Sequence, residues 1–369
     1  MKENHAPADY TGRIREKWSF RRSNYFEHVG NEVKAVTESC GFLDMSAFAK
    51  IEVSGSGARK WLNSIFANNI SKKRGRVALC HLLTCHGGVK SEFTVYEWAD
   101  NMFYLVSAGA YETHDHDVLF RHLPKDGSVE LRPITQQYGV LVLAGPNARK
   151  VLAKLTDIKL NNASFPWLSG QKISVGTATA HALRVNFVGE LGWEFHHPME
   201  MQNQIWDAVM EAGEEFGIKP FGIRAMTAMA IEKSYRLIPR ELSIEYSAYE
   251  SALDRFIKLD KDFIGKEALV RRHEAGDDWK FVTLEVHGVV DADARGSEAI
   301  YNGDELVGRA THGGFGYRIG KSLALAMVKP GQETAGNVLE IRILGDRYKV
   351  TVIEESPFDP TNQRLRADA

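Results

Sequence analysis

The sequence predicts an α+β protein built from two related lobes and a smaller C-terminal β domain. A pattern of strand, glycine turn and helix occupies 53–66 and returns at 140–152, which indicates a repeated unit. From Phe281 onward, short apolar runs alternate with glycine turns, as is typical of a small β barrel or sandwich. A stretch rich in acidic residues at 274–279 precedes this last part. The predicted domains are 1–134, 135–273 and 274–369.

The composition is that of an ordinary globular protein in water. Of the 369 residues, 44% are hydrophobic and 25% charged, enough to bury a core in two or three domains. The formal net charge of −2 provides no attraction to nucleic acid or to an anionic membrane. No apolar run approaches the roughly 18 residues of a membrane span, and the polar lead-in at 1–22 lacks the apolar core of a signal peptide. We expect a cytoplasmic protein without nucleic-acid or membrane partners.

The cysteines indicate a reducing compartment and no metal site. Three cysteines, Cys40, Cys80 and Cys85, do not form a disulfide framework. His81 and His86 directly follow two of them, but no second pair at metal-ligand spacing accompanies them. A strand through this stretch would also distribute these side chains over both of its faces. We therefore predict no bound metal.

Helices and strands alternate in the first lobe. Apolar residues recur at helical spacing up to Gly41, which ends the pattern. After the first glycine turn, a second apolar stripe runs from Ala58 to Ile65. Alternating apolar and polar runs then predict a meander of strands. The predicted elements are helices at 24–40, 58–65 and 111–122, and strands within 42–53 and 77–107.

The second lobe repeats this order. Ser-Gly-Ser-Gly-Ala-Arg-Lys-Trp-Leu at 54–62 aligns in register with Ala-Gly-Pro-Asn-Ala-Arg-Lys-Val-Leu at 144–152, as expected after an ancient duplication. Each glycine turn precedes a helix, which would suit a phosphate, but neither completes a nucleotide-binding motif, so a simple helix start is favoured. The tail after Pro357 is polar and expected to be only partly ordered. The further predicted elements are strands within 171–197 and helices at 201–217 and 223–233.

The stretch His86 to Tyr96 is a candidate centre of the chemistry. Its Gly-Gly pair supplies a turn, and the β-branched and aromatic residues after it predict a strand. Period-two alternation places Lys90, Glu92 and Tyr96 on one face. A carboxylate just beyond a tight turn is able to bind or activate a ligand; the alternative is a solvated strand face.

Three other clusters contain candidate residues. Glu190 and Glu194 flank a glycine turn, and paired carboxylates there suit the amino-pyrimidine edge of a flat heterocycle; the alternative is a polar hairpin turn. The segment 223–236 includes Glu232 and Arg236 at helical spacing, which predicts an ion pair. The third cluster is the glycine-rich loop 313–318, which contains an aromatic residue and a cation and is most simply a β turn.

The ordered series of motifs resembles the aminomethyltransferase (glycine-cleavage T-protein) superfamily. The likeness is greatest to the tetrahydrofolate-binding C-terminal half of dimethylglycine and sarcosine dehydrogenases, and it extends from about Tyr25 to Arg364. The motifs that support it are Gly41–Ser46, Gly87–Val95, Gly145–Arg149, Gly189–Glu194, Ala230–Lys233 and Gly316–Ala324.

This resemblance implies a three-domain cloverleaf of the aminomethyltransferase type around a central channel that holds folate. Glu92 occupies the position of the family's catalytic aspartate, and Tyr235 is assigned a catalytic role beside it, with His86 and Lys90 as alternative acids. Glu194 is the first candidate for the pterin-binding glutamate and Glu190 the second. The remaining residues assigned to the cofactor site are Tyr96, Arg224 and Tyr317.

The sequence also departs from the family pattern. Glu92 replaces an aspartate, and Met226 and Ala230 stand where T-proteins usually have arginines, which argues against glycine cleavage. No Gly-x-Gly-x-x-Gly motif for a flavin is present. The resemblance then implies a tetrahydrofolate-dependent demethylase that moves a methyl group from an N-, S- or O-methylated small molecule to N5 of tetrahydrofolate. The alternatives are a subunit that captures formaldehyde or an iminium from a separate flavoprotein, and a non-catalytic folate-binding protein.

Overall fold

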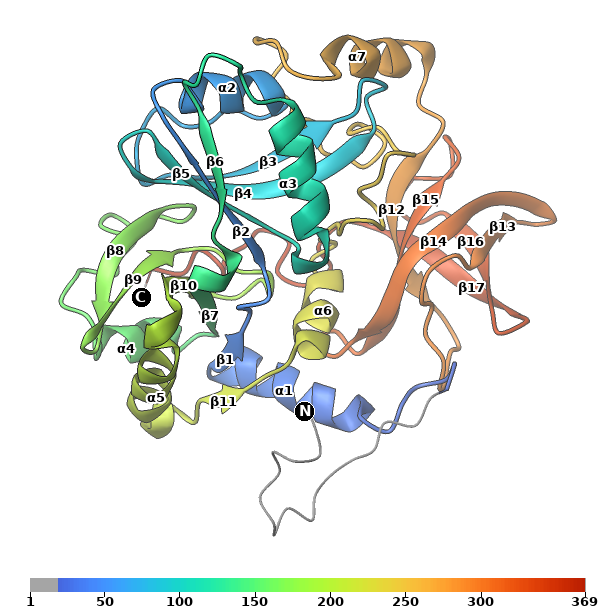
Figure 1. The fold of residues 1–369 in the computed structure, drawn as a ribbon. Coiled ribbons are helices and arrows are strands. Elements are labelled where there is room, and N and C mark those ends of the chain that lie inside the picture. Colours follow the sequence, from blue (N-terminus) through green and yellow to red (C-terminus); the bar gives the residue numbers. More distant parts are fainter. Residues whose placement is uncertain (1–18, 369) are drawn as a thin grey trace.

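Two β-sheets and a closed β-barrel meet around the short helix α6 (Ile223–Ile231) (Figure 1). The computed structural model describes residues 19–368, so most of the predicted lead-in at 1–22 lies outside the described residues. The predicted α+β class is confirmed, and the predicted C-terminal β domain is a barrel. We call the three parts the first lobe, the second lobe and the barrel.

The first lobe is an antiparallel sheet of five strands in the order β3-β4-β5-β2-β6. Its outer face, with Phe93 and Val95, packs on α2 and α3. Its inner face turns toward the second lobe, where Tyr96 and Tyr104 pack against Leu183. Its elements are β2 (Ala49–Ser54), α2 (Ala58–Ile65), β3 (Val77–Leu83), β4 (Val89–Ala99), β5 (Met102–Ser107), η2 (Gly109–Tyr111), α3 (Glu112–Arg121) and β6 (Glu130–Pro133).

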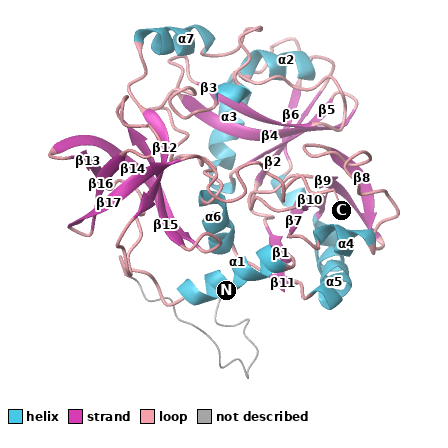
Figure 2. Ribbon diagram, turned by 180° about the vertical axis from the view of Figure 1, so that it is seen from behind, coloured by secondary structure: helices cyan, strands magenta, loops and turns pink. Residues whose placement is uncertain are grey.

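The second lobe is a sheet of six strands in the order β11-β1-β7-β10-β9-β8. Its outer face, with Trp193 and Phe195, packs on α4 and α5, which Figure 2 shows together on one side of the sheet. Its inner face, with Val140 and Val142, is covered by α1 and α6. Its elements are α1 (Phe26–Glu38), β1 (Gly41–Asp44), η3 (Thr135–Gln137), β7 (Tyr138–Ala144), α4 (Ala148–Ala153), β8 (Gly170–Val175), β9 (Ala178–Leu183), β10 (Gly192–Pro198), η4 (Met199–Met201), α5 (Gln202–Gly213), η5 (Glu214–Phe216) and β11 (Lys219–Pro220).

Backbone hydrogen bonds confirm that the two glycine turns are equivalent. Gly55 and Gly145 follow β2 and β7 with φ angles of +115° and +130°, a region that favours glycine. The residue two positions after each glycine donates its N–H to a serine carbonyl, that of Ser128 in the first lobe and Ser39 in the second. A Cβ added at Gly55 would lie 2.3 Å from the Ser128 carbonyl oxygen, and one added at Gly145 would lie 2.5 Å from that of Ser39. These amides are bonded within the protein, in agreement with the helix-start interpretation.

Strand β1 belongs to the sheet of the second lobe although it comes before the first lobe in the chain. It pairs with β7 and β11 of the second-lobe sheet. Strand β6 has the matching place beside β2 in the first sheet. The domain boundaries at 134 and 273 remain a prediction, but residues 26–44 pack on the second lobe rather than on the first.

The barrel closes in the order β12-β15-β14-β13-β16-β17 around an apolar interior. The preceding segment contains two further helices, of which α7 lies apart from the others (Figure 2). No helix between residues 19 and 368 is both long and apolar enough to cross a membrane. The elements are η6 (Asp254–Phe256), α7 (Lys266–Ala275), β12 (Lys280–Val286), β13 (Ala299–Asn302), β14 (Glu305–Gly316), β15 (Lys321–Val328), β16 (Val338–Ile343) and β17 (Asp346–Ile353).

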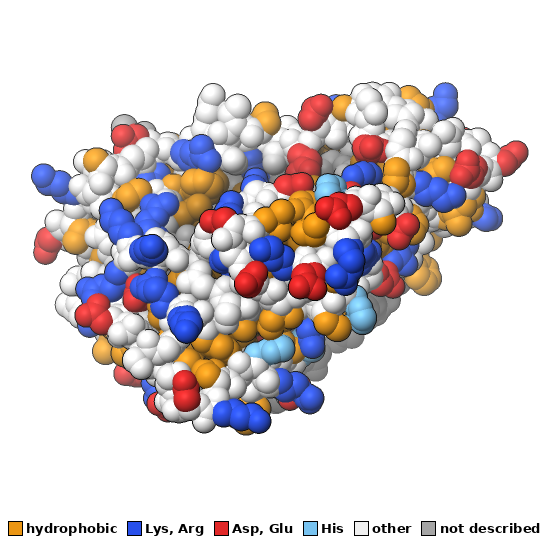
Figure 3. Space-filling view, turned by 90° about the horizontal axis from the view of Figure 1, so that it is seen from above, with side chains coloured by type: hydrophobic (Ala, Val, Ile, Leu, Met, Phe, Trp, Pro, Cys, Tyr) orange, Lys and Arg blue, Asp and Glu red, His pale blue; other side chains and the backbone are white. Residues whose placement is uncertain are grey.

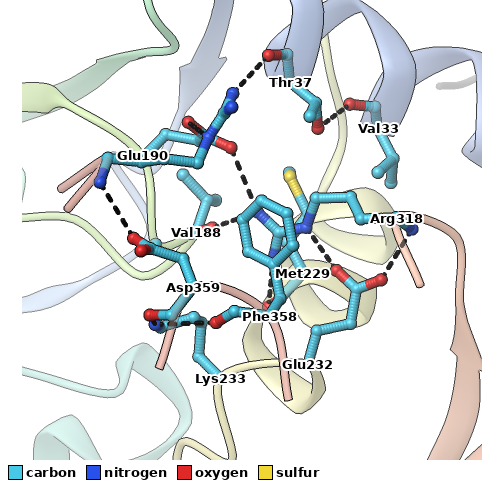
Figure 4. Close-up of polar contacts among 12 residues, drawn as sticks. Val33, Thr37, Val188, Glu190, Met229, Glu232, Lys233, Arg318, Phe358 and Asp359 are labelled. Carbon is cyan, nitrogen blue, oxygen red and sulfur yellow. Dashed lines mark hydrogen bonds and ion pairs between the residues drawn. The ribbon is translucent and has the colours of Figure 1, made fainter. Parts of the chain in front are cut away.

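A buried ion cluster joins the barrel to α6 and to the second lobe (Figure 4). Arg318 lies in the turn between β14 and β15, and its side chain is 2% exposed. Its backbone N–H donates to Glu232 Oε1 at 2.7 Å, and its guanidinium bonds to the same carboxylate. The guanidinium also donates to the carbonyls of Met229 at 2.8 Å and Val188 at 2.9 Å, and lies 3.4 Å from Glu190 Oε1. One side chain of the barrel therefore bonds to two other segments, the C-terminal end of α6 and the turn 188–190 of the second lobe.

The C-terminal tail folds back onto the second lobe, contrary to the expectation of partial order. Arg364 donates from Nε to Glu190 Oε2 at 2.7 Å, which completes the ion cluster. Near the end of the tail, the carbonyl of Ala367 accepts hydrogen bonds from Arg149 at 2.8 Å and Arg184 at 3.1 Å. Figure 1 accordingly marks the C-terminus beside this lobe. The cations that bind the tail come from distant segments, so the tail's polar composition did not reveal its order.

The ion pair predicted between Glu232 and Arg236 is wrong. Helix α6 ends at Ile231, so the two residues do not lie on one helical face. Glu232 faces Arg318, whereas Arg236 makes two bonds of 2.7 Å to Glu355 beyond the barrel. The early end of the helix redirects both side chains to the barrel side of the molecule.

Replacement of Arg318 by methionine should strongly destabilise the protein. The change leaves Glu232 and Glu190, which are 0% and 1% exposed, without their shared cation. We expect the free energy of unfolding to fall by about 3–5 kcal/mol in urea denaturation, as for other broken buried pairs. Arg74→Met is the control, because Arg74 and its partner Asp100 are 59% and 89% exposed, and it should cost less than about 1 kcal/mol. Equal losses in the two variants would contradict the role of the ion cluster.

Candidate active site

Glu92 lies on the inner face of β4 beside a buried histidine. Its Oε2 is 2.8 Å from Nε2 of His81 on β3. The imidazole is 0% exposed, whereas the side chain of Glu92 is 23% exposed. Among the described residues, no second group hydrogen bonds to this carboxylate, and Nδ1 of His81 also has no partner there. One carboxylate oxygen is thus held in place while the other is available to a ligand.

A β-bulge determines this pairing. The register between β3 and β4 shifts so that Lys90 is an extra residue on β4, and beyond it His81 lies opposite Glu92. Without the shift, His81 would lie opposite Ser91. The alternation from Glu92 to Tyr96 is regular, so these two side chains share the inner face, in agreement with the predicted pattern.

Tyr235 lies near the charge of Arg255 in η6, and the next residue of η6, Phe256, packs on the histidine that holds Glu92. The ring of Phe256 lies 5.5 Å from that of His81. Burial raises the pKa of Tyr235 to about 12, and the nearby charge of Arg255 acts in the opposite direction. The phenol packs against Phe187, with ring centroids 5.1 Å apart. Tyr235 is therefore a neutral hydrogen-bond donor at physiological pH and not a base.

The two alternative acids lie elsewhere on the hairpin. His86 is exposed at its tip, in the turn 84–88. The charge of Lys90 lies near His122 at the end of α3. Burial and this charge together lower the pKa of His122. Among the described residues, none of the three candidate acids hydrogen bonds to Glu92 or to the His81 side chain.

Glu194 lies on the inner face of β10 and belongs to a chain of polar contacts between the lobes. Its side chain is 12% exposed, and its Oε2 is 3.3 Å from Nε2 of the fully buried His196. Nδ1 of His196 is 3.1 Å from the hydroxyl of Tyr104 on β5. Burial raises the pKa of Tyr104 well above its usual value, so the phenol remains protonated. Glu194 thus keeps capacity to accept further hydrogen bonds.

Aromatic rings surround this contact between the lobes. Trp98 stacks on Tyr104 at 4.7 Å and lies 5.3 Å from both Tyr138 and His181. Tyr96 is 4% exposed, and its hydroxyl is 3.5 Å from Nδ1 of His181. Burial raises the pKa of Tyr96 to about 12. The predicted cofactor residue Tyr96 is thus part of the aromatic wall, with its ring already packed.

The two carboxylates have matching surroundings. Glu92 and Glu194 lie on the inner faces of related sheets, and each is partly exposed and held by a fully buried histidine. A carboxylate next to stacked rings binds a flat heterocycle that presents neighbouring N–H donors. A carboxylate fixed by one oxygen stabilises positive charge on a ligand. The site is therefore suited to a flat, nitrogen-rich molecule and a cationic reacting group.

Glu190 is placed differently from Glu194. Its carboxylate is 1% exposed and bonded to Arg364 at 2.7 Å and Arg318 at 3.4 Å. Burial raises the pKa of Glu190, and the two arginines lower it. The carboxylate belongs to the ion cluster, and this structural role accounts for its place in the turn. Its assignment as the second pterin candidate remains a prediction.

Arg224 and Tyr317 lie in a separate cavity between α1, α6 and β14. The cavity has a volume of about 390 Å³, and none of Glu92, Glu194 and Tyr235 lines it. The Tyr317 hydroxyl donates to the carbonyl of Phe26 at 2.8 Å, which ties the barrel to α1. The structure thus divides the predicted site residues between two places. Family motifs do not indicate which side of α6 Arg224 occupies or where the turn after β14 places Tyr317.

Sequence reasoning missed His81, His196 and Tyr104. His81 was considered only as a metal ligand, and its pairing with Glu92 depends on a bulge that the residue pattern does not reveal. His196 meets Tyr104 across the lobe interface, a contact between residues 92 positions apart. The alternation in β10, which places Glu194 and His196 on one face, was a usable signal for that pair.

Metal-ligand side chains do not cluster in the described part of the chain, and the charges are mixed on the face that Figure 3 shows. Within residues 19–368, no three His, Cys, Asp or Glu side chains come together as metal ligands do. Figure 3 shows acidic and basic side chains interspersed with apolar patches on the face seen from above.

The fold is a three-part α+β architecture in which two duplicated lobes each have a partly exposed carboxylate on the inner face of the sheet. The GCVT N-terminal domain model matches residues 2–261, and the model of the glycine cleavage T-protein C-terminal barrel domain matches residues 280–359. This chain belongs to the glycine cleavage T-protein (GCVT) family. The resemblance inferred from its motifs is confirmed.

Relatives of two kinds share most of this chain. Dimethylglycine dehydrogenase, mitochondrial, of Homo sapiens is 37% identical over 353 residues, which cover 94% of this chain but 40% of that protein. The chain thus spans less than half of that relative's length. Aminomethyltransferase of Thermoanaerobacter sp. (strain X514) is 29% identical, with 94% of each protein covered. Glycine cleavage system aminomethyltransferase T from Bartonella henselae has the same fold, with a TM-score of 0.81 and 18% identity over 90% of each chain.

His181 should make the stability of the protein depend on pH. Burial lowers the pKa of His181 from 6.5 to about 4, so the unfolded chain binds more protons between these values. The free energy of unfolding should therefore fall as the pH is lowered from 6.5 toward 4. In urea denaturation across this window, His181→Phe should show a flatter dependence than the wild type, whereas His28→Phe, at an exposed position, should not. Identical slopes for all three proteins would contradict the buried, neutral imidazole.

Proposed function

We propose that this protein moves a one-carbon unit from a methylated small molecule to tetrahydrofolate, with Glu194 in the folate site and Glu92 at the reacting centre. The observation that carries the proposal is the pair of partly exposed carboxylates on facing inner sides of two duplicated sheets, each held by a fully buried histidine. Family membership supports it, because a relative of nearly the same length is an aminomethyltransferase.

The surroundings of Glu194 fit the ring of a folate. A pterin has a flat ring and neighbouring N–H donors on one edge, which a carboxylate accepts while aromatic faces cover the ring. Glu194 has one histidine contact at 3.3 Å and remains 12% exposed, so acceptor capacity is left. Tyr104, which contacts the same histidine, is 1% exposed, so the aromatic surface left to a ligand is that of the partly exposed Trp98, which stacks on Tyr104. When bound, tetrahydrofolate supplies N5, a nucleophilic nitrogen that accepts a one-carbon unit.

Glu92 is the proposed electrostatic residue. His81 fixes one carboxylate oxygen at 2.8 Å and leaves the other open, so little reorganisation is needed when positive charge develops nearby. This charge favours a methyl donor that is cationic or becomes cationic at the methyl-bearing atom. His81 is a positioning residue in this scheme, because it acts through Glu92.

Tyr235 is the proposed proton donor when the leaving atom is an oxygen. Its raised pKa, about 12, keeps the phenol protonated at neutral pH, as a hydrogen-bond donor to a leaving oxygen must be. An ammonium or sulfonium donor leaves as a neutral group and needs no proton. The contribution of Tyr235 should therefore differ between these classes of donor.

A second candidate function is the capture of formaldehyde or an iminium released by a separate flavoprotein. The observation in its favour is that this chain matches 40% of the length of a dimethylglycine dehydrogenase. Glu92 and Glu194 would have the same places in it, since a cationic iminium and the same folate ring would be bound. A non-catalytic folate-binding protein is the third reading, and the matched carboxylate–histidine pairs weigh against it.

Calorimetric titration with tetrahydrofolate under reducing conditions tests the folate site. We expect micromolar binding by the wild type, and Glu194→Ala should weaken it roughly 10- to 100-fold through loss of charge-assisted hydrogen bonds. Glu200→Ala, an exposed position shortly after β10, is the control and should bind as the wild type does. Absence of binding by the wild type would rule out the proposal.

The methyl donor is sought by detection of methyl-tetrahydrofolate with a quaternary ammonium, a sulfonium and a methoxyarene. Glu92→Gln should reduce turnover by about 100-fold or more while leaving the dissociation constant of tetrahydrofolate within about a factor of three. Glu92→Asp is the matched control, since it keeps the charge and should retain part of the activity. His81→Gln should lower kcat rather than folate affinity.

Three outcomes separate the candidate functions. Methyl-tetrahydrofolate formed from any donor supports transfer. Tetrahydrofolate-dependent consumption of formaldehyde that requires Glu92, without methyl transfer, supports the capture function instead. Turnover that is unchanged in Glu92→Ala would remove Glu92 from the mechanism and favour a binding protein.

A further inference from the structure

Two arginines of the second lobe converge on one backbone oxygen of the C-terminal tail. Arg149 belongs to α4, and Arg184 directly follows β9 and is 1% exposed. Nη2 of each donates to the carbonyl of Ala367, at 2.8 Å and 3.1 Å respectively. The other oxygens that accept hydrogen bonds from the two guanidiniums belong to Leu160, Asn162 and Phe165. Among the described residues, both cations therefore hydrogen bond only to neutral groups.

Each of these guanidiniums has a donor that is not used. Nη1 of Arg149 and Nε of Arg184 are buried and have no hydrogen-bond partner among the described residues. Within a guanidinium, Nε and Nη2 lie side by side on one edge, and Nη1 and Nη2 lie side by side at the end. Each arginine thus has two neighbouring donors, of which the carbonyl of Ala367 uses one. An anion with two or more oxygens bonds to both donors of such a fork.

The positive charge of the two arginines is not neutralised by a buried anion. Burial lowers the pKa of Arg149, and burial together with the charge of Arg149 lowers the pKa of Arg184 to about 10. The charge of Asp368 acts in the opposite direction on both. This carboxylate is exposed, however, and accepts a hydrogen bond from the backbone N–H of Asn162 at 2.5 Å. Two buried like charges cost free energy, which a bound anion would offset.

A third unused donor lies next to the two arginines. The ring of Trp193 on β10 is fully buried, and its centroid lies 5.8 Å from the guanidinium carbon of each arginine. Its Nε1 also has no hydrogen-bond partner among the described residues. Buried polar groups are normally hydrogen-bonded, so three unused donors on neighbouring side chains indicate a place for an acceptor.

The end of the tail covers this place from the outside. Leu365, 4% exposed, is the last buried side chain that the structure describes, and Arg366 and Asp368 are exposed. None of 366–368 is buried, so their movement would break polar contacts without withdrawing an apolar side chain from the core. The carbonyl of Ala367 is therefore the part of the lining that a ligand can replace at the lowest cost.

We propose that Arg149 and Arg184 form a binding site for a small oxyanion, of the carboxylate or phosphate type, which replaces the carbonyl of Ala367. One oxygen of the anion accepts from the two Nη2 atoms, and further oxygens accept from Nη1 of Arg149 and Nε of Arg184. Trp193 belongs to the outer face of the second-lobe sheet, whereas Glu194 lies on the inner face. The oxyanion is thus distinct from the folate and the methyl donor, and the proposal does not depend on the transferase activity.

The test is calorimetric titration of the full-length protein with phosphate and with acetate at pH 7, at an ionic strength held constant with sodium chloride. Saturable binding of at least one of these anions is expected. Arg149→Lys keeps the charge but loses the fork, and it should weaken binding at least about tenfold. Arg342→Lys, at an exposed barrel position, is the control and should bind as the wild type does. No saturable binding by the wild type, or equal affinity in Arg149→Lys, would overturn the proposal.

Hydrogen exchange of the wild type tests the displacement without any substitution. The backbone N–H of Asn162 is bonded to Asp368, so its exchange reports whether the end of the tail is docked. At saturation with the anion that binds, exchange should become faster in peptides that contain Asn162 or 366–368 and stay unchanged in α7. Unchanged or slower exchange next to the arginines would contradict displacement of the carbonyl.

The carboxylate of Asp368 is the other source of the same chemistry, and its removal separates the two. With a free anion as the ligand, Asp368→Asn should keep or strengthen the binding of phosphate or acetate, because a competing carboxylate is lost. Loss of that binding in Asp368→Asn would assign the two arginines to the carboxylate of the tail and overturn the proposal. Tetrahydrofolate titration should give the same result in Arg149→Lys as in the wild type, so failure here is distinguishable from failure of the folate site.

Discussion

The Arg318 guanidinium is the interaction on which the assembly of the three parts depends. It bonds to the carboxylate at the end of α6, to a carbonyl within α6 and to a carbonyl of the second lobe, while its own backbone belongs to the barrel. Glu190 and Arg364 balance the remaining charges and fix the C-terminal tail. Because these groups are buried, the loss of one member leaves a charge without compensation. Tyr235 follows the end of α6 directly, so the ion cluster also positions the candidate acid.

The duplicated lobes explain why the candidate site lies where it does. Each lobe buries its outer face against its own helices, and the inner faces meet each other where α1 and α6 do not cover the second sheet. Registers in the two sheets place Tyr104 opposite Glu52 and Glu194 opposite Val142, which makes Tyr104 and Glu194 equivalent positions of the repeat. The copies have diverged there into a phenol and a carboxylate, and His196 now bridges the two.

Helix α6 has a different environment on each side. One side packs against the sheet of the second lobe. The other side lines the cavity that contains Arg224 and Tyr317 and that none of the candidate carboxylates lines. Arg224 and Tyr317 were grouped with the carboxylates on the basis of motifs, yet they belong to this second environment.

The sequence by itself determined the features that depend on local periodicity. Apolar spacing predicted most helices and strands, the glycine turns predicted the duplication, and alternation predicted that Glu92 and Tyr96 share a face. The tertiary structure alone decided the long-range pairings: the bulge that places His81 opposite Glu92, the transfer of β1 to the second sheet, and the contacts of Arg318. The physical reason is that a residue's own face is set by backbone geometry within a few positions. Its partner is set by strand register and lobe packing, to which residues far along the chain contribute.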